Sequence, residues 1–128
     1  MHLSVAYELM GSEIVLRRLV DRFYDLMDED PDYFGIRKLH PQELSSSRQK
    51  LVMFLSGWTG GPSLYVEKYC EPRLRSRHLS FSIGIAERDQ WLSCMNRAME
   101  EIGLEEQLRK SLTKAFEQTA DFMRNQPK

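Results

Sequence analysis

The stretch from Ser12 to Asp30, SEIVLRRLVDRFYDLMDED, decides the fold class. Its apolar residues recur at steps of three and four, which is the pattern of an amphipathic helix with a wide buried face. These residues are Val15, Leu16, Leu19, Val20, Phe23, Tyr24 and Met27. Proline disfavours helical geometry in the residue before it, so Pro31 predicts that the helix ends by Asp30. The same Asp-Pro pair can start a new turn.

Downstream of this helix, a short helical turn around Tyr33–Phe34 precedes a second clear helix pattern. The cluster Ser45–Ser47 offers side-chain oxygens that can cap a helix start. The apolar residues of the expected helix are Leu51, Phe54, Leu55 and Trp58. We expect Gly60-Gly61-Pro62 to end it, because glycine and proline interrupt helical geometry.

The second half of the chain predicts two more long helices. Between Pro62 and Gly84 the periodicity weakens, and we expect a loop with one short helix. Residues 82–85 (SIGI) have no partner strand, and a lone strand is not viable, so a helix or its approach is favoured there. The long helices are Glu87–Ile102, which Gly103 stops, and Glu105–Met123. Their apolar residues are Trp91, Leu92, Met95, Ala98 and Met99 in the first, and Leu108, Leu112, Ala115, Phe116, Thr119 and Phe122 in the second. The sequence therefore predicts an all-α protein with about four substantial helices.

Length and composition limit the class further. The 128 residues suit one domain over residues 1–128. A content of 41% hydrophobic and 29% charged residues argues against a disordered or fibrous chain. The net charge of -1 leaves no global attraction to nucleic acid or an anionic membrane. The longest apolar run, Leu51–Leu55, is far below the roughly 20 residues of a membrane span. We expect a cytoplasmic protein whose two cysteines, Cys70 and Cys94, are reduced.

The candidate chemistry centres on one histidine. The chain contains no GxSxG, HExxH or CxxC motif, which argues against the common hydrolases and zinc sites. His78 ends the basic run Arg73–Arg77 and precedes Leu79 and Phe81, so its imidazole lies between a cationic and an apolar stretch. Spacing leaves two interpretations open. His78 is either a half-buried histidine bonded to a backbone carbonyl or the single axial ligand of a haem iron.

Several spaced blocks resemble the group II truncated globins, which are compact haem proteins of bacteria and plants. The blocks are Phe23-Tyr24, Phe54-Leu55 with Trp58, Gly60-Gly61-Pro62 with Tyr65, Pro72–His78 (PRLRSRH) with Phe81, and Glu87–Leu92 (ERDQWL) running to Cys94-Met95. The resemblance covers nearly the whole chain. It implies a two-over-two helical sandwich around a haem, with His78 as the proximal ligand of the iron.

The same resemblance assigns a distal side to the haem. It implies that Tyr24 and Trp91 donate hydrogen bonds to the bound ligand, whereas spacing alone would make both of them core aromatics. Ser47 would face the haem as a small residue. His40 stands where the family commonly has tyrosine or phenylalanine. It is either a capping or surface histidine before Pro41 or a third distal polar group, which could move protons near neutral pH or bind the iron as a sixth ligand.

The resemblance also suggests how the haem would be held. Leu51, Phe54, Phe81 and Ile83 would pack on the porphyrin, and Lys50, Tyr65 and Arg77 are candidates to bind its propionates. The two cysteines lack the spacing of a covalent attachment motif, which implies a non-covalent haem b. Two departures from the family pattern are Cys70-Glu71, in place of glycine and histidine, and Gly11-Ser12, in place of a glycine pair.

Three functions remain as hypotheses. The first is reversible binding of oxygen or another diatomic ligand, with Tyr24 and Trp91 slowing its release. The second is a redox enzyme on the same haem that oxidises nitric oxide or reduces peroxide, with Tyr24, His40 and Trp91 positioning oxygen and donating protons. Either would use a reductase partner to keep the iron ferrous. The third is a haem-free helical interaction domain in which these aromatic residues are only packing.

Overall fold

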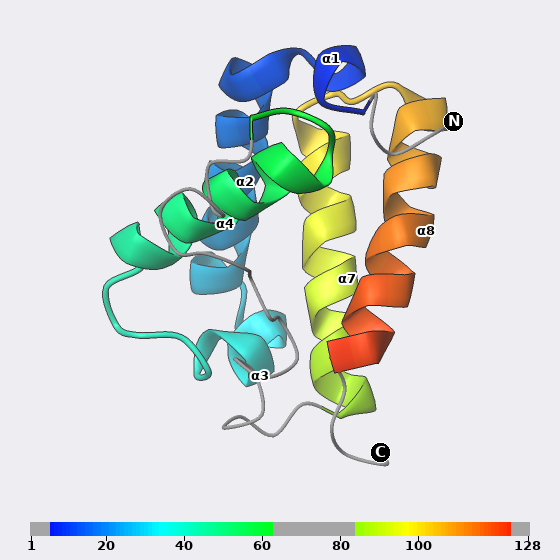
Figure 1. Cartoon of the computed structure of the whole chain (residues 1–128). Coiled ribbons are helices and arrows are strands. Elements are labelled where there is room, and N and C mark those ends of the chain that lie inside the picture. The colour runs from blue at the N-terminus through cyan, green and yellow to red at the C-terminus, as the bar shows by residue number, and fades with distance from the viewer. Residues whose placement is uncertain (1–5, 63–83, 124–128) are drawn as a thin grey trace.

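The computed structural model describes residues 6–62 and 84–123 of the chain (Figure 1). Its elements are α1 (Ala6–Met10), α2 (Ser12–Glu29), η2 (Pro31–Tyr33), α3 (Phe34–Arg37), α4 (Ser45–Trp58), α7 (Ile85–Glu101) and α8 (Glu106–Met123). All regular structure within these two ranges is helical, and four of the helices have 14 residues or more. The expected all-α class is therefore confirmed. No helix in the described ranges is long and apolar enough to cross a bilayer.

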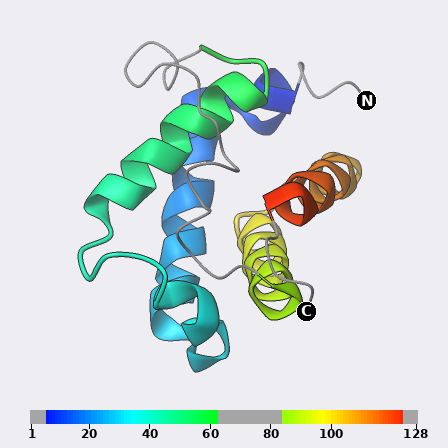
Figure 2. The same ribbon diagram turned by 60° about the horizontal axis from the view of Figure 1, so that its bottom comes forward.

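The four long helices form two pairs. α2 packs against α4 on one side of the molecule, α7 packs against α8 on the other, and α2 and α7 join the pairs (Figures 1 and 2). The short elements η2 and α3 lie at one end, in contact with both α2 and α7. This is the two-over-two arrangement that the family resemblance implied.

The centre of the molecule is an apolar seam between α2 and α7. The apolar seam consists of Leu16, Leu19, Val20, Phe23 and Met27 of α2 with Cys94, Met95, Ala98 and Met99 of α7, all of them 0–1% exposed. α8 adds the buried residues Leu108, Leu112 and Phe116, while Ala115 and Thr119 are only half-buried. Removing these side chains from water is the main force that holds the two pairs together.

The helix starts differ from the expectation in the residues that cap them. The Glu43 carboxylate, not a serine side chain, caps α4, because its Oε1 accepts hydrogen bonds from the backbone N–H and the hydroxyl of Ser45 at 2.9 and 2.6 Å. Glu105 does the same for α8, accepting from the N–H groups of Gln107 and Leu108 at 3.0 Å. The prediction that the serine cluster caps α4 was therefore wrong. A carboxylate reaches the unpaired N–H groups of a first turn and is also favoured there by the helix dipole.

The turn after α4 is a point of close contact with α1, which the sequence reading did not anticipate. The backbone N–H of Tyr7 donates to the Thr59 carbonyl at 2.8 Å. A Cβ added at Gly61 would lie 2.5 Å from the Tyr7 ring, so only glycine fits there. Gly60 has a φ of 94°, and Gly103, with a φ of 82°, ends α7 as expected.

Candidate functional site

Tyr24 lies on α2 beside the apolar seam and is 5% exposed. The Phe23 ring meets the Tyr24 ring edge-on, with centroids 5.0 Å apart. Burial raises the pKa of the Tyr24 phenol above its ordinary value, and the Arg48 guanidinium, 5.7 Å from the ring centroid, offsets this only in part. The hydroxyl therefore keeps its proton at neutral pH and can donate a hydrogen bond.

Trp91 lies half-buried on α7 and contacts Phe23, the same ring that Tyr24 contacts. The ring centroids of Phe23 and Trp91 are 5.2 Å apart, and the Phe116 ring of α8 meets the indole edge-on with centroids 5.3 Å apart. Two polar aromatic side chains from different helices are therefore held around one buried phenylalanine. Within the part of the chain that the structure describes, neither the Tyr24 hydroxyl nor the Trp91 indole N–H is used in a hydrogen bond.

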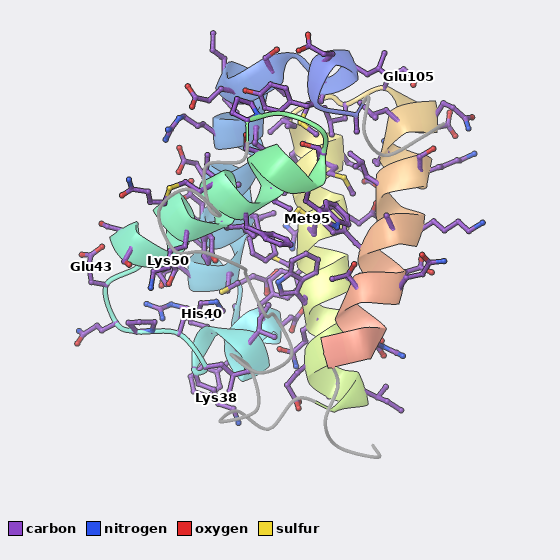
Figure 3. The ribbon with its side chains drawn as sticks, in the orientation of Figure 1. Lys38, His40, Glu43, Lys50, Met95 and Glu105 are labelled. Atoms are coloured by element: carbon purple, nitrogen blue, oxygen red, sulfur yellow. The ribbon has the colours of Figure 1, made fainter. Side chains whose placement is uncertain are left out.

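His40 lies half-buried on the segment between α3 and α4 (Figure 3). Its Nδ1 is 2.8 Å from the Ile36 carbonyl oxygen. A carbonyl can only accept, so Nδ1 carries a proton in this contact. The His40 ring meets the Tyr24 ring edge-on at 5.6 Å. The structure thus brings His40 and Tyr24 together.

The expected residues of α4 line up along one helix. Ser47 and Leu51 are half-buried, and Leu51 packs against the hydrophobic core. Phe54 is also half-buried and stacks on Trp58 with centroids 6.4 Å apart. Lys50 is exposed on the same helix (Figure 3).

The remaining predicted site residues fall on residues 63–83. They are His78, Tyr65, Arg77, Phe81 and Ile83, and all of them lie outside the described residues. Their roles as the iron ligand, porphyrin contacts and propionate partners remain predictions.

The sequence reading missed Arg48. The Arg48 guanidinium donates to the Asp21 carbonyl at 3.0 Å and to the Asp25 carboxylate at 2.8 Å, and so ties α4 to α2 directly over Tyr24. Asp21 and Asp25 are four residues apart on α2, so this spacing predicts that their carboxylates lie on one face of the helix, close to Tyr24. The helix that supplies their partner could not be read from that spacing.

A second missed feature is a row of polar contacts between α7 and the η2–α3 segment, here named the polar latch. Gln90 Oε1 accepts from the Ile36 N–H at 3.1 Å, and the Ser93 and Tyr33 hydroxyls are 3.2 Å apart. Arg97 donates to Asp30 Oδ2 at 2.7 Å and to the Tyr33 hydroxyl at 3.4 Å. The spacing of Gln90, Ser93 and Arg97 puts them on one face of α7.

Comparison with known proteins agrees with this arrangement. Residues 5–125 match the family of bacterial-like globins. The group 2 truncated hemoglobin YjbI of Bacillus subtilis (strain 168) is 41% identical over 123 residues, which is 96% of this chain and 90% of that protein. The structure of a group II 2-on-2 hemoglobin from Agrobacterium tumefaciens superposes with a TM-score of 0.92 at 43% identity, over 95% of each chain.

A further similar structure is that of the truncated oxygen-avid haemoglobin from Bacillus subtilis. Its structure has a TM-score of 0.87 and 40% identity, over 94% of this chain and 99% of that one. Family model, relatives and fold agree along nearly the full length. The chain therefore belongs to the bacterial globin family and is a group II truncated haemoglobin with the two-over-two helical fold.

Proposed function

We propose that this chain binds oxygen reversibly at the iron of a non-covalent haem b, with His78 as the proximal ligand and with Tyr24 and Trp91 as distal donors. Membership of the globin family implies the haem cofactor and oxygen as its ligand. The similar Bacillus subtilis protein is described as oxygen-avid. The iron supplies the bond to the diatomic ligand, and the chain supplies every other contact.

One observation carries the distal part of this proposal: two hydrogen-bond donors flank Phe23, and neither is used within the described residues. A haem ligand site needs mostly apolar walls and a few placed polar groups. The half-buried Leu51 and Phe54 of α4 would provide apolar walls, and Tyr24 and Trp91 would provide the donors. Because its pKa is raised, the Tyr24 phenol stays protonated. It can therefore donate a hydrogen bond to the ligand, whereas a phenolate would repel a partly anionic ligand.

The expected consequence is slow ligand release. A hydrogen bond to a charged group contributes about 1.5–3 kcal/mol. Each such donor would therefore slow dissociation of a partly anionic ligand by roughly 10- to 150-fold. Slow release suits sensing, scavenging or delivery to a partner better than bulk transport.

The other pocket residues keep the roles that the family resemblance implies. Lys50, Tyr65 and Arg77 would hold the haem propionates, since carboxylates at a pocket mouth pair with cationic or hydroxyl groups. Leu51, Phe54, Phe81 and Ile83 would pack on the porphyrin. Ser47 would leave room on the distal side as a small residue.

A second function on the same haem, oxidation of nitric oxide or reduction of peroxide, is favoured by the place of His40. Its imidazole lies beside Tyr24, 5.6 Å from ring to ring. An imidazole there can take up and return a proton that the phenol passes on. The same ring could bind the iron as a sixth ligand, which would give the ferric protein low-spin character.

The decisive experiment measures oxygen dissociation by stopped flow in Tyr24→Phe and Trp91→Phe. We expect each variant to release oxygen roughly 10- to 150-fold faster, with a much smaller change for the neutral ligand carbon monoxide. Tyr33→Phe is the matched control, because Tyr33 is also a buried tyrosine but bonds to Ser93 in the polar latch. Rates in Tyr24→Phe and Trp91→Phe that match wild type would refute the distal assignment.

Two further measurements separate the alternatives. His78→Ala should lose the haem, which the absorption spectrum shows directly. A purified wild type that carries no haem and rejects added hemin would support the interaction-domain hypothesis instead. Turnover of peroxide or nitric oxide well above that of free hemin would favour the enzyme.

A further inference from the structure

The position of His40 depends on a very short helix. α3 has four residues, Phe34–Arg37, and His40 follows three residues later. A single helical turn is not stable alone, because forming it fixes several residues for few hydrogen bonds. The place of His40 therefore depends on the contacts that hold α3, together with Arg37, whose guanidinium donates to the carbonyls of Pro41 and Gln42 at 2.9 and 2.8 Å.

Gln90 holds α3 at the residue that also orients His40. Gln90 Oε1 accepts from the Ile36 N–H at 3.1 Å, and the Ile36 carbonyl accepts from His40 Nδ1 at 2.8 Å. Ile36 thus bonds to Gln90 through its backbone N–H and to His40 through its carbonyl. The chain of contacts runs from α7 through Ile36 to the imidazole beside Tyr24.

The Gln90 amide lies close to the backbone of α3 at Gly35. A Cβ added at Gly35 would lie 2.6 Å from both Oε1 and Nε2 of the Gln90 amide. Glycine at position 35 therefore lets the amide approach the backbone of α3. Gln90 also immediately precedes Trp91 on α7, so the same helical turn holds the segment of His40 and carries the indole.

We infer that Gln90 is a positioning residue for the distal site, which acts through Ile36 to hold His40 in the Nδ1-protonated form beside Tyr24. The functional part of this inference rests on the proposed distal role of His40. Gln90 itself need not touch the ligand. Ser93 and Arg97 belong to the same latch but bind Tyr33 and Asp30 instead of Ile36, so they stabilise the segment without orienting the imidazole.

The test reads the tautomer of His40 directly. Protein labelled with nitrogen-15 histidine, haem-loaded and saturated with carbon monoxide, is examined by NMR, and His40→Ala assigns the two ring signals. Wild type should show a proton on Nδ1. Gln90→Leu should give a mixture of tautomers, and Gln90→Glu, whose carboxylate still accepts from Ile36, should restore the wild-type signal. Ser93→Ala should leave it unchanged.

Two outcomes would overturn the inference. One is a wild-type tautomer in Gln90→Leu, and the other is an equal disturbance in Ser93→Ala, which would indicate general loosening. If Gln90→Leu does not fold, Gly35→Ala provides the same test, because it displaces the Gln90 amide while leaving the residue in place. A wild-type tautomer in Gly35→Ala would likewise overturn the inference.

A double-mutant cycle links the tautomer to function. Gln90→Leu should change the oxygen dissociation rate by about two- to tenfold, the effect of one ordinary hydrogen bond. The same change made in His40→Ala should have no further effect. If His40→Ala alone releases oxygen at the wild-type rate, the distal role of His40 fails, while the NMR result still decides whether Gln90 positions the ring.

Discussion

The apolar seam and the polar latch both lie on α7, yet they join it to its neighbours by different means. The seam buries Cys94, Met95, Ala98 and Met99 against α2 at 0–1% exposure. The latch presents Gln90, Ser93 and Arg97 to η2 and α3 through hydrogen bonds at or near the surface. One helix thus carries both an apolar contact that determines the fold and a polar contact that places the segment of His40.

The two contacts differ in strength for a physical reason. Burying a large apolar side chain fully contributes about 1.5–3 kcal/mol. Exposed ion pairs contribute about 0–1 kcal/mol, because water solvates the separated charges well. The pair of α2 and α7 therefore forms a rigid scaffold, and the distal edge at α3 can be adjusted by single substitutions without loss of the fold.

The largest effect should come from the centre of the seam. Phe23→Ala should lower the free energy of unfolding by about 3–5 kcal/mol, because it removes a buried ring and leaves a cavity between α2 and α7. Urea unfolding followed by circular dichroism measures the change. Loss of the ring that contacts both Tyr24 and Trp91 should also disturb both distal donors.

Phe34→Ala is the matched control for that substitution. Phe34 is 65% exposed on α3, so its removal should change the free energy of unfolding by no more than about 0.5 kcal/mol. Equal losses in the two variants would contradict the contrast between a dry seam and a solvated edge.

A second, smaller effect tests how dry the seam is. Burial raises the pKa of the Cys94 thiol to about 12, and the thiol donates to the Phe23 carbonyl at 3.2 Å. The unfolded chain deprotonates first as the pH rises, so stability is complete below the usual thiol pKa of about 8.5 and falls above it. The loss should approach about 1.4 kcal/mol per pH unit.

Urea unfolding between pH 8 and 10.5 measures this slope. Cys94→Ala should be less stable at pH 8 but should lose stability more slowly toward pH 10.5, since it lacks the titrating thiol. Cys70 is present in both proteins, so its contribution cancels. A parallel decline in wild type and variant would show that water reaches the Cys94 thiol in the folded protein.

The seam could be predicted from sequence, and the latch could not. Every member of the seam on α2 follows the three- and four-residue steps of one helix, because burial on one face imposes that period. Tyr24 and Trp91 came from the family resemblance, since a buried aromatic at helical spacing looks the same whether it packs or binds. Burial explains their position, and they differ from ordinary core residues only in donor groups that make no hydrogen bond within residues 6–62 and 84–123.

The latch escaped prediction because its partners are far apart in sequence. Gln90 contacts Ile36 across 54 residues, and Ser93 contacts Tyr33 across 60. Which polar side chains pair depends on how the folded backbone brings them together, so these pairs leave no periodic pattern in the sequence. The caps show the same limit at short range: a serine cluster matched the rule for helix starts, but Glu43, with a longer side chain, reached the Ser45 N–H.

The smallest effect should appear at the edge of the latch, where Asp30 receives hydrogen bonds from the Asp32 N–H and from Arg97. These bonds, the backbone one foremost, hold the pKa of Asp30 below its usual value. The stability that they contribute is present above the usual carboxyl pKa and is lost as the pH falls through the lowered value.

Arg97→Met should move the Asp30 pKa only part of the way back, because the Asp32 bond remains. A carbon-13 titration of the carboxyl group measures the shift, with Arg17→Met, which removes an exposed pair with Glu13, as the control. An unchanged Asp30 pKa in Arg97→Met would mean that water screens this end of the latch completely, and that Gln90 and Ser93 hold α3 without it.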